Sequence, residues 1–162
     1  MRFILRQKLL AWGNDFIVRD EAGNDAFVVD GRAISLGNKA SFQDTAGNEL
    51  AFISQKFLSL VPVYEIFIGG ALAAVVRKDV FKLFHQTFSV DVPGPDDLTA
   101  EGDLTQHEYA FRRGERPVAH VSKKWFTLAD TYGVDIGEGE DAVLILACAV
   151  VIDLVCHDHR RR

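Results

Sequence analysis

Short apolar stretches separated by polar turns run through most of the chain. Two of the turns share the pattern D-x-A-G-N, at residues 20–24 and again at residues 44–48. In such a turn the aspartate side chain starts the reversal, and glycine or asparagine takes the positive φ that closes it. Apolar residues flank each copy on both sides, so both segments are predicted to form β-hairpins.

The same alternation predicts two further hairpins and two single strands. They cover residues 63–68 with 71–76, residues 107–111 with 117–121, residues 3–9, and residues 84–92. Gly69-Gly70 supplies the turn of the third hairpin, and Arg113-Gly114-Glu115 supplies the turn of the fourth. The proline-containing stretch 91–97 is expected to be a loop. The chain is therefore predicted to be mainly β.

The end of the chain has a different pattern. Residues 142–156 are apolar except for Asp153, and no polar stripe with the helical period precedes that residue. Acidic residues come before the run, and His157 and three arginines follow it, as the helix dipole favours. This pattern predicts an α-helix that is apolar on all sides and must be buried on all sides.

Two arrangements can bury such a helix. A membrane span needs about 20 apolar residues, whereas this run is shorter and carries a carboxylate near one end. A closed sheet of many strands has an interior wide enough to hold one helix. We favour the internal helix, and a membrane anchor is the alternative.

Composition narrows the class of protein. The 162 residues are 48% hydrophobic and 25% charged, which suits a single globular domain over residues 1–162. A formal net charge of −5 argues against a general nucleic-acid binder, which needs a broad basic surface. The first residues contain no apolar stretch long enough for a signal peptide, so a cytoplasmic location is expected.

The two cysteines, Cys148 and Cys156, both fall within the predicted helix. Their spacing separates them by roughly 12 Å along the helix axis, whereas a disulfide needs Cα atoms within about 7 Å. They cannot pair with each other. We expect reduced thiols that act as small buried hydrophobic groups.

Several features occur together in an order that resembles the LURP-one-related family. They are the paired D-x-x-G hairpins, VSKKWF at residues 121–126, YGVDI at residues 132–136 and the apolar C-terminal helix. This family is similar to Tubby C-terminal domains and phospholipid scramblases. The resemblance implies a closed antiparallel β-barrel of about twelve strands around a central hydrophobic α-helix at residues 140–156. It supplies no catalytic residues, and no cofactor is expected.

The candidate ligand-binding residues, for a headgroup or another anion, are all basic. They are Arg112, Arg113, Arg116, Lys123 and Lys124. Cross-strand neighbours in a hairpin lie within about 5 Å, so several of these side chains could converge on one anionic group. Arginine offers phosphate a bidentate fork, and lysine offers a mobile charge. The opposing interpretation is a solvated strand face whose charges prevent aggregation.

A second basic group is open to the same two interpretations. It consists of Arg77, Lys78 and Lys82. Trp125, next to Lys124, is a residue type that favours lipid interfaces. Tubby domains bind phosphoinositide headgroups through basic surface residues, but no residue-by-residue match to that site is evident here.

Two further groups suggest metal ions only weakly. The acidic residues near the predicted helix lack the spacing of a calcium loop, and helix N-terminal charge accounts for several of them. They are Asp130, Asp135, Glu138, Glu140 and Asp141. The tail at residues 156–159, Cys-His-Asp-His, offers transition-metal ligands, but four consecutive residues rarely reach tetrahedral geometry. A polar tail is the opposing interpretation, and no metal is expected.

Nothing in the sequence predicts an enzyme. The nucleophile-elbow, P-loop and dinucleotide-binding patterns are absent. His85, His107 and His120 fall on predicted strands and are interpreted as histidines of the core edge or surface. The first hypothesis is a non-enzymatic module that binds anionic phospholipid headgroups or similar phosphate ligands, peripherally at a membrane. The alternative is a protein-interaction or signalling adaptor with no small-molecule ligand.

Overall fold

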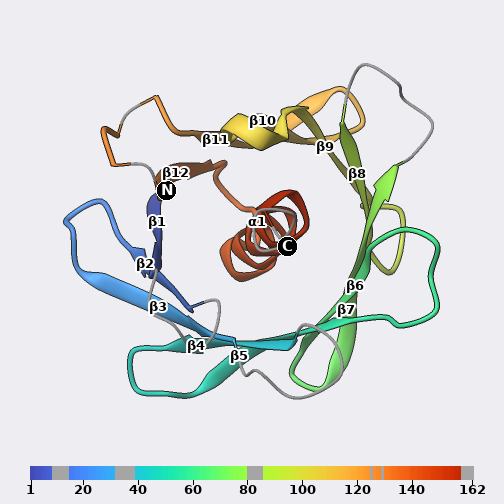
Figure 1. The fold of residues 1–162 in the computed structure, drawn as a ribbon, viewed down its shortest axis with the longest axis horizontal. Helices are drawn as coiled ribbons and strands as arrows, with labels where there is room; N and C mark the ends of the chain where they lie inside the picture. The colour runs from blue at the N-terminus through green and yellow to red at the C-terminus, as the bar shows by residue number, and fades with distance from the viewer. Residues whose placement is uncertain (9–14, 32–38, 80–85, 125, 129, 158–162) are drawn as a thin grey trace.

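The structure, a computed structural model, describes residues 1–8, 15–31, 39–79, 86–124, 126–128 and 130–157. In these ranges twelve antiparallel strands close into a barrel, in which each strand pairs with its neighbours in the chain and β1 pairs with β12 (Figure 1). The strands are β1 (Arg2–Lys8), β2 (Asp15–Arg19), β3 (Asp25–Asp30), β4 (Lys39–Asp44), β5 (Glu49–Gln55), β6 (Val63–Ile68), β7 (Ala71–Asp79), β8 (Thr87–Asp91), β9 (Leu98–Asp103), β10 (Glu108–Arg113), β11 (Arg116–Ser122) and β12 (Thr131–Ile136). A 3-10 turn, η1 (Leu104–Gln106), joins β9 to β10, and the helix α1 (Ala142–His157) follows β12.

The two D-x-A-G-N turns have the same hydrogen bonds. In each, the backbone N–H of the glycine donates to the aspartate carbonyl, at 3.0 Å for Gly23 and 3.1 Å for Gly47. The asparagine N–H donates to the aspartate carboxylate at 2.9 Å in both copies. Each glycine has a positive φ near 85°. The predicted β2–β3 and β4–β5 hairpins are therefore confirmed, as are β6–β7 and β10–β11.

The helix α1 lies inside the ring of strands (Figure 1). Eleven consecutive residues, Ile145 to Val155, are buried, and most of them have no exposed surface. Asp141 begins the helix, because its carboxylate accepts a hydrogen bond from the Leu144 N–H at 3.1 Å. The predicted internal helix is confirmed. No helix formed by the described residues has the length and hydropathy needed to cross a bilayer.

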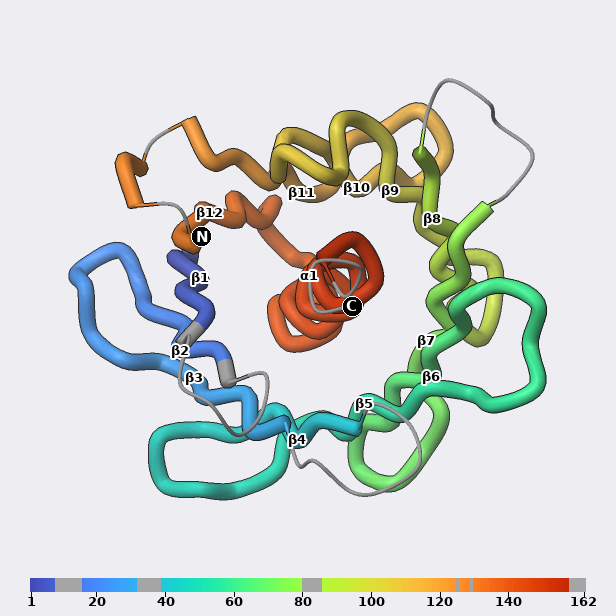
Figure 2. The backbone as a smooth tube through the Cα atoms, in the orientation of Figure 1, coloured from blue at the N-terminus to red at the C-terminus, as the bar shows by residue number. Residues whose placement is uncertain are grey.

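The barrel wall supplies the other half of the core. Inward-facing side chains alternate with outward ones along the strands, so Phe16, Phe42, Ile66, Phe88 and Phe111 are fully buried against the helix side. Both cysteines are free thiols, as predicted, with Cys148 buried and Cys156 half-buried. Figure 2 traces the chain once around the ring before it turns inward into α1.

The two ends of the barrel differ in their connections. At one end, called the turn end, the strands are joined by turns such as residues 20–24 and 114–115, and α1 begins there. At the other, called the loop end, lie the connections at residues 56–62, 104–107 and 123–130, and α1 finishes there. The antiparallel pairing fixes this division, because each strand runs from one end to the other.

Two local features differ from the sequence interpretation. The sequence pattern did not predict β9, because only Leu98 and Ala100 of that strand face the core while its second half is exposed. His107 does not begin a strand. It follows η1 in the left-handed conformation, with φ 54° and ψ 44°, and β10 begins at the next residue. His85 and Lys82 lie outside the described residues.

Candidate functional site

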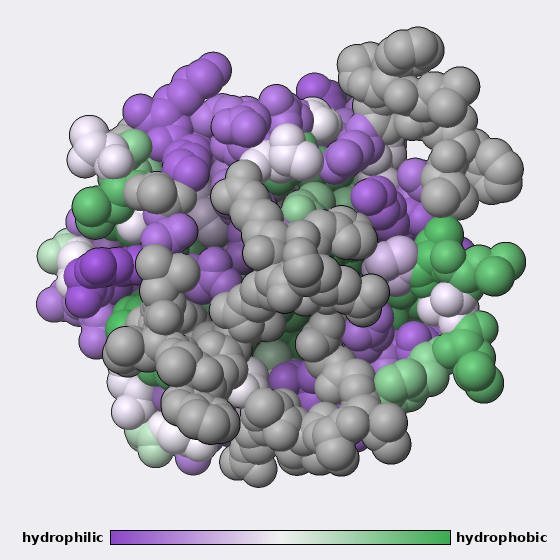
Figure 3. All heavy atoms as spheres, in the orientation of Figure 1, coloured by the Kyte–Doolittle hydropathy of each residue, from purple (hydrophilic) through white to green (hydrophobic). Residues whose placement is uncertain are grey.

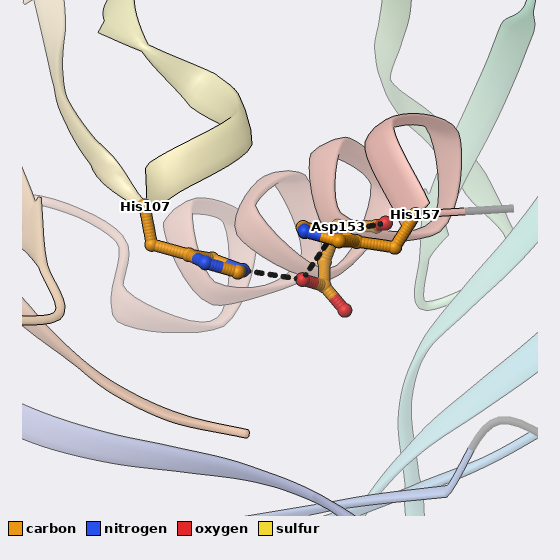
Figure 4. Close-up of side chains that lie close together, drawn as sticks. All are labelled: His107, Asp153 and His157. Carbon is orange, nitrogen blue, oxygen red and sulfur yellow. Dashed lines mark hydrogen bonds and ion pairs between the residues drawn. The ribbon is translucent and has the colours of Figure 1, made fainter. Parts of the chain in front are cut away.

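Two histidines and one aspartate meet at the loop end, between the helix and the wall (Figure 4). Asp153 and His157 lie one turn apart on α1, and His107 reaches them from the junction of η1 and β10. His107 Nε2 lies 2.5 Å from Asp153 Oδ1, and His157 Nδ1 lies 3.0 Å from the same oxygen. His157 Nδ1 also lies 3.1 Å from the Asp153 carbonyl oxygen. We call these three residues the His–Asp–His cluster.

His107 has a strained backbone conformation, and its ring is packed between two other rings. A non-glycine residue in the left-handed region costs about 1–2 kcal/mol, and His107 is one of two such residues in the part of the chain that is described. Its ring stacks on Tyr132, with centroids 4.3 Å apart, and on His157, with centroids 4.7 Å apart. The imidazole is thereby held between the wall and the helix, with Nε2 toward Asp153.

Asp153 is a buried carboxylate in an otherwise apolar helix. Burial by itself raises the pKa of Asp153. The hydrogen bonds with His107 and His157 lower it by more than burial raises it, so the pKa lies below the usual value. The ionised form is therefore the favoured one. Burial raises the pKa of Tyr109 and of Tyr132 well above the ordinary value, and the negative charge of Asp153 adds to the rise.

Four buried polar atoms of the described residues have no hydrogen-bond partner, and three of them belong to His107 or to tyrosines whose pKa the charge of Asp153 raises. The four atoms are His107 Nδ1, Tyr109 Oη, Thr131 Oγ1 and Tyr132 Oη. A buried polar atom without a partner costs about 1–3 kcal/mol, and such atoms are rare in proteins. Three of these atoms near one carboxylate make the interior of the loop end locally polar within an apolar barrel.

Among the described residues, the connection between β5 and β6 is the most exposed apolar part of the loop end. Phe57 is 55% exposed, and Leu58 and Leu60 are fully exposed. We call residues 56–62 the apolar loop. It is held at its base by a 2.8 Å hydrogen bond from the Lys56 N–H to the Val63 carbonyl. Figure 3 shows hydrophobic side chains gathered at the edge where β5 and β6 are joined.

Leu58 is the second non-glycine residue with a positive φ, at 65°. Inside the apolar loop the Ser59 hydroxyl donates to the Val61 carbonyl at 2.7 Å. The loop is thus a defined structure that presents leucine side chains to the outside. Large apolar side chains in one exposed loop are a feature of interaction sites.

The five predicted ligand-binding residues lie at opposite ends of the barrel. Arg112 and Arg113 end β10, and Arg116 begins β11, all at the turn end. Lys123 and Lys124 follow the last residue of β11, at the loop end. Lys123 comes seven positions after Arg116, or about 23 Å along an extended strand. One small headgroup cannot contact both groups, and ligand binding by either group stays a prediction.

At the turn end the arginines have acidic partners. Arg113 makes a bidentate pair with Glu140, at 2.8 and 2.9 Å, and Arg116 approaches the same carboxylate at 3.2 Å. Arg112 donates to the Glu115 carbonyl at 3.0 Å. The hydrogen bond from Arg113 lowers the pKa of Glu140 and raises that of Arg113 itself. The arginines at the turn end are therefore largely engaged by groups of the same chain.

At the loop end the backbone of both lysines is held by hydrogen bonds, and the Lys124 side chain is exposed. The N–H groups of Lys123 and Lys124 donate to the Glu108 carboxylate at 3.0 and 3.1 Å. The Lys124 side chain is 79% exposed, with its Nζ 4.0 Å from Glu108. Lys78 lies at this end too, and its N–H bonds the Pro62 carbonyl of the apolar loop at 3.4 Å. Trp125 lies outside the described residues.

The two metal hypotheses based on sequence have different outcomes. Asp135 pairs with Arg2 at 2.8 Å, Glu140 pairs with Arg113, and Asp141 caps the helix, so these carboxylates do not converge on one point. Of the tail residues 156–159, the last two lie outside the described ranges. His157 has instead been brought together with Asp153 and His107.

Comparison with known proteins assigns the chain to a family. A family model described as LURP-one-related matches residues 1–153. The chain belongs to the LURP-one-related family. A relative in Bacillus subtilis (strain 168), named Uncharacterized protein YxjI, is 34% identical over 160 residues, covering 98% of this chain and 95% of the relative. An X-ray structure of a protein from Arabidopsis thaliana has the same fold, with a TM-score of 0.66 and 18% identity, covering 99% of this chain and 92% of that one.

Membership of the LURP-one-related family confirms the resemblance in the sequence and agrees with the barrel. The matched stretch includes His107 and ends at Asp153, so His157 lies just beyond it. The sequence contained one local signal for the cluster, because Asp153 and His157 are four residues apart in a predicted helix and must share a face. Nothing local links His107 to them, since it lies 46 residues before Asp153.

Proposed function

We propose that this LURP-one-related protein is a non-enzymatic module that binds anionic phospholipid headgroups at a membrane surface through its loop end. The observation that carries the proposal is the apolar loop. Among the described residues, six large apolar side chains are exposed, and four of them are at the loop end. These four are Phe57, Leu58, Leu60 and Leu128.

The apolar loop supplies the attraction to the lipid interior. Burying a leucine or phenylalanine side chain is worth about 1.5–3 kcal/mol. Insertion of Phe57, Leu58 and Leu60 to the acyl boundary would therefore offset a substantial part of the cost of association. The 2.8 Å hydrogen bond that closes the base of the loop limits the ordering that insertion requires.

Lysines at the same end supply the preference for anionic headgroups. Lys56 stands at the base of the apolar loop, Lys78 bonds the loop through its backbone, and Lys124 is largely exposed across the barrel mouth. Each such charge near an anionic bilayer contributes about 1 kcal/mol. The turn end is a weaker candidate, because Glu140 and Asp96 engage Arg113 and Arg116 approaches the same Glu140 carboxylate.

Vesicle flotation tests the proposal. The protein should float with phosphatidylcholine vesicles that contain phosphatidylserine or a phosphoinositide, and much less with pure phosphatidylcholine. Leu58→Ser/Leu60→Ser should abolish flotation, and Lys123→Ala/Lys124→Ala should weaken binding by about thirtyfold, since two charges are lost. The matched controls are Leu72→Ser and Arg116→Ala, which change an exposed apolar and an exposed basic residue at the turn end.

The outcomes separate membrane binding from the alternative adaptor function. Binding that is equal for neutral and anionic vesicles, or that the control substitutions reduce as strongly as the loop substitutions, contradicts the proposal. A protein partner that binds the apolar loop at high salt, without any flotation, would support the adaptor instead, because headgroup binding weakens with ionic strength.

A further inference from the structure

The His–Asp–His cluster has the composition and placement of a metal site. We propose that His107, Asp153 and His157 bind one divalent transition-metal ion, which fastens the end of α1 to the barrel wall. This site is independent of the membrane surface proposed above, because it lies in the interior of the loop end. Its two elements are joined only by tertiary structure, so an ion there would tie the helix to the η1–β10 junction.

The geometry brings the three donor atoms within reach of one ion. One ligand atom from each residue can be chosen so that all three lie within 4.8 Å of one another. Imidazole nitrogen and carboxylate oxygen bind Zn²⁺ at about 2.0–2.2 Å, so two ligands of one ion lie within about 4.2 Å of each other. Asp153 Oδ1 lies 2.5 Å and 3.0 Å from the two imidazole nitrogens, and these hydrogen-bonded separations would open to about 3.4 Å around a tetrahedral ion. The His107 and His157 rings are stacked and nearly parallel, so one ring must also turn before both nitrogens point at the same ion.

The donor set selects a class of metal. Two imidazoles with one carboxylate suit first-row ions such as Zn²⁺, Fe²⁺ or Co²⁺, whereas Ca²⁺ and Mg²⁺ prefer sets made of oxygen atoms. Asp153 and His157 lie one helical turn apart, a spacing that presents both side chains to the same ion. In the part of the chain that the structure describes, this is the one group of three such residues close enough to hold an ion.

The unpartnered polar atoms point to the same conclusion independently. His107 Nδ1 and the hydroxyls of Tyr109 and Tyr132 are buried and have no partner among the described residues. Water that completes the coordination of a metal would give the two tyrosine hydroxyls a partner. The second nitrogen of a metal-binding histidine is usually hydrogen-bonded too, so water would also be expected on His107 Nδ1. The ion and its water would thus supply partners to polar groups that the described residues leave without any.

Metal binding to the protein stripped with a chelator tests the proposal. Titration with Zn²⁺ alone should give one saturable site by calorimetry, and Co²⁺ alone should give a visible spectrum of nitrogen and oxygen ligands. At free Zn²⁺ about 100 times the Kd, the Tm should rise by roughly 5–10 °C. Absence of a saturable site in the native protein overturns the proposal.

Substitutions locate the site. His107→Gln and His157→Gln should each weaken Zn²⁺ binding by more than about tenfold, whereas His120→Gln, on the outer face of β11, should not. His159→Gln tests the neighbouring tail histidine. Zn²⁺ affinity that is unchanged in His107→Gln, or that is lost only in His159→Gln, overturns the proposal.

A measurement on the native chain covers the case in which His107→Gln fails to fold. The ring ¹⁵N signals of the histidines report on coordination directly, because a metal-bound nitrogen loses its proton. Zn²⁺ should shift the signals of His107 and His157 and leave those of His120 in place. A shift confined to other histidines overturns the proposal.

Discussion

Gly102 of β9 lies opposite Tyr109 of β10, with the β10 backbone close against it. A Cβ atom at this position would lie 2.5 Å from the Glu108 carbonyl oxygen and 2.8 Å from the Tyr109 Cα. Both are backbone atoms, so neither can turn away. The φ of Gly102 is also positive, at 139°. Glycine is therefore required at this position, shortly before η1 and His107.

Gly102→Ala is expected to destabilise the protein by about 3 kcal/mol, since it adds backbone overlap to an unfavourable φ. The Tm should fall by roughly 6–12 °C for a chain of this size. Gly114→Ala is the matched control, because Gly114 has a positive φ of 60° but open space around it. Thermal unfolding of both variants checks the prediction, and equal losses would show that the overlap is relieved.

Residues whose roles depend on local sequence could be predicted, and those whose roles depend on tertiary contacts could not. Asp20 and Asp44 act on residues two to four positions away, so their turns were evident in the sequence. His107 takes its conformation from η1 and its partners from α1 and β12. The spacing of residues in the sequence does not predict these contacts of His107.

Glu140 links the start of the helix α1 to the β10–β11 hairpin. It lies between β12 and α1, where its carboxylate holds Arg113 of β10 and Arg116 of β11. In the sequence, Glu140 was interpreted as one of the acidic residues that interact favourably with the dipole at the helix N-terminus. In the structure its carboxylate accepts hydrogen bonds from these arginines, and Asp141 caps the helix. The pair fixes the entrance of the helix against the β10–β11 hairpin.

The lowered pKa of Glu140 makes its contribution to stability dependent on pH. Because the folded pKa lies below the unfolded value of about 4.3, the stabilisation is complete above that pH and is lost as the pH falls through the folded pKa. Glu140→Gln should therefore cost about 1–2 kcal/mol at pH 7, and the difference from the native protein should shrink below about pH 4.

Urea unfolding between neutral pH and pH 3 measures that difference. Glu138→Gln is the matched control, since Glu138 is an exposed neighbour in the same turn. The control should show little difference from the native chain at any pH. A cost for Glu140→Gln that persists undiminished in acid would mean that the carboxylate acts by shape rather than by charge.

Elements with a strong periodic pattern were predicted within about three residues at each end. The helix was expected at residues 140–156 and occupies Ala142–His157. β9 was missed because its buried half is only two residues long. The apolar loop was also missed as a site, because an apolar stretch before a proline gives no sign in sequence that its side chains face outward. Exposure is a property of the assembled barrel.

The barrel and its helix depend on each other as a whole. A closed sheet of twelve strands encloses more space than its own inward side chains can fill, so the wall needs a filling element. The helix is apolar on every side and has no stable place in water. Its eleven buried residues meet the inward side chains of strands from the entire circumference. The barrel core is therefore shared between wall and helix.

A chain that ends at Asp141 should consequently not fold. Loss of the helix removes on the order of ten buried apolar side chains, each worth about 1.5–3 kcal/mol, and this exceeds the 5–15 kcal/mol by which domains are typically stable. Leu146→Ala in the full chain, which removes part of one fully buried side chain, should still fold with a loss of about 2–5 kcal/mol. Near-UV circular dichroism and thermal unfolding compare the two. A cooperative transition in the shortened chain would show that the twelve strands close without the helix, and the helix would then be an addition to the barrel instead of its core.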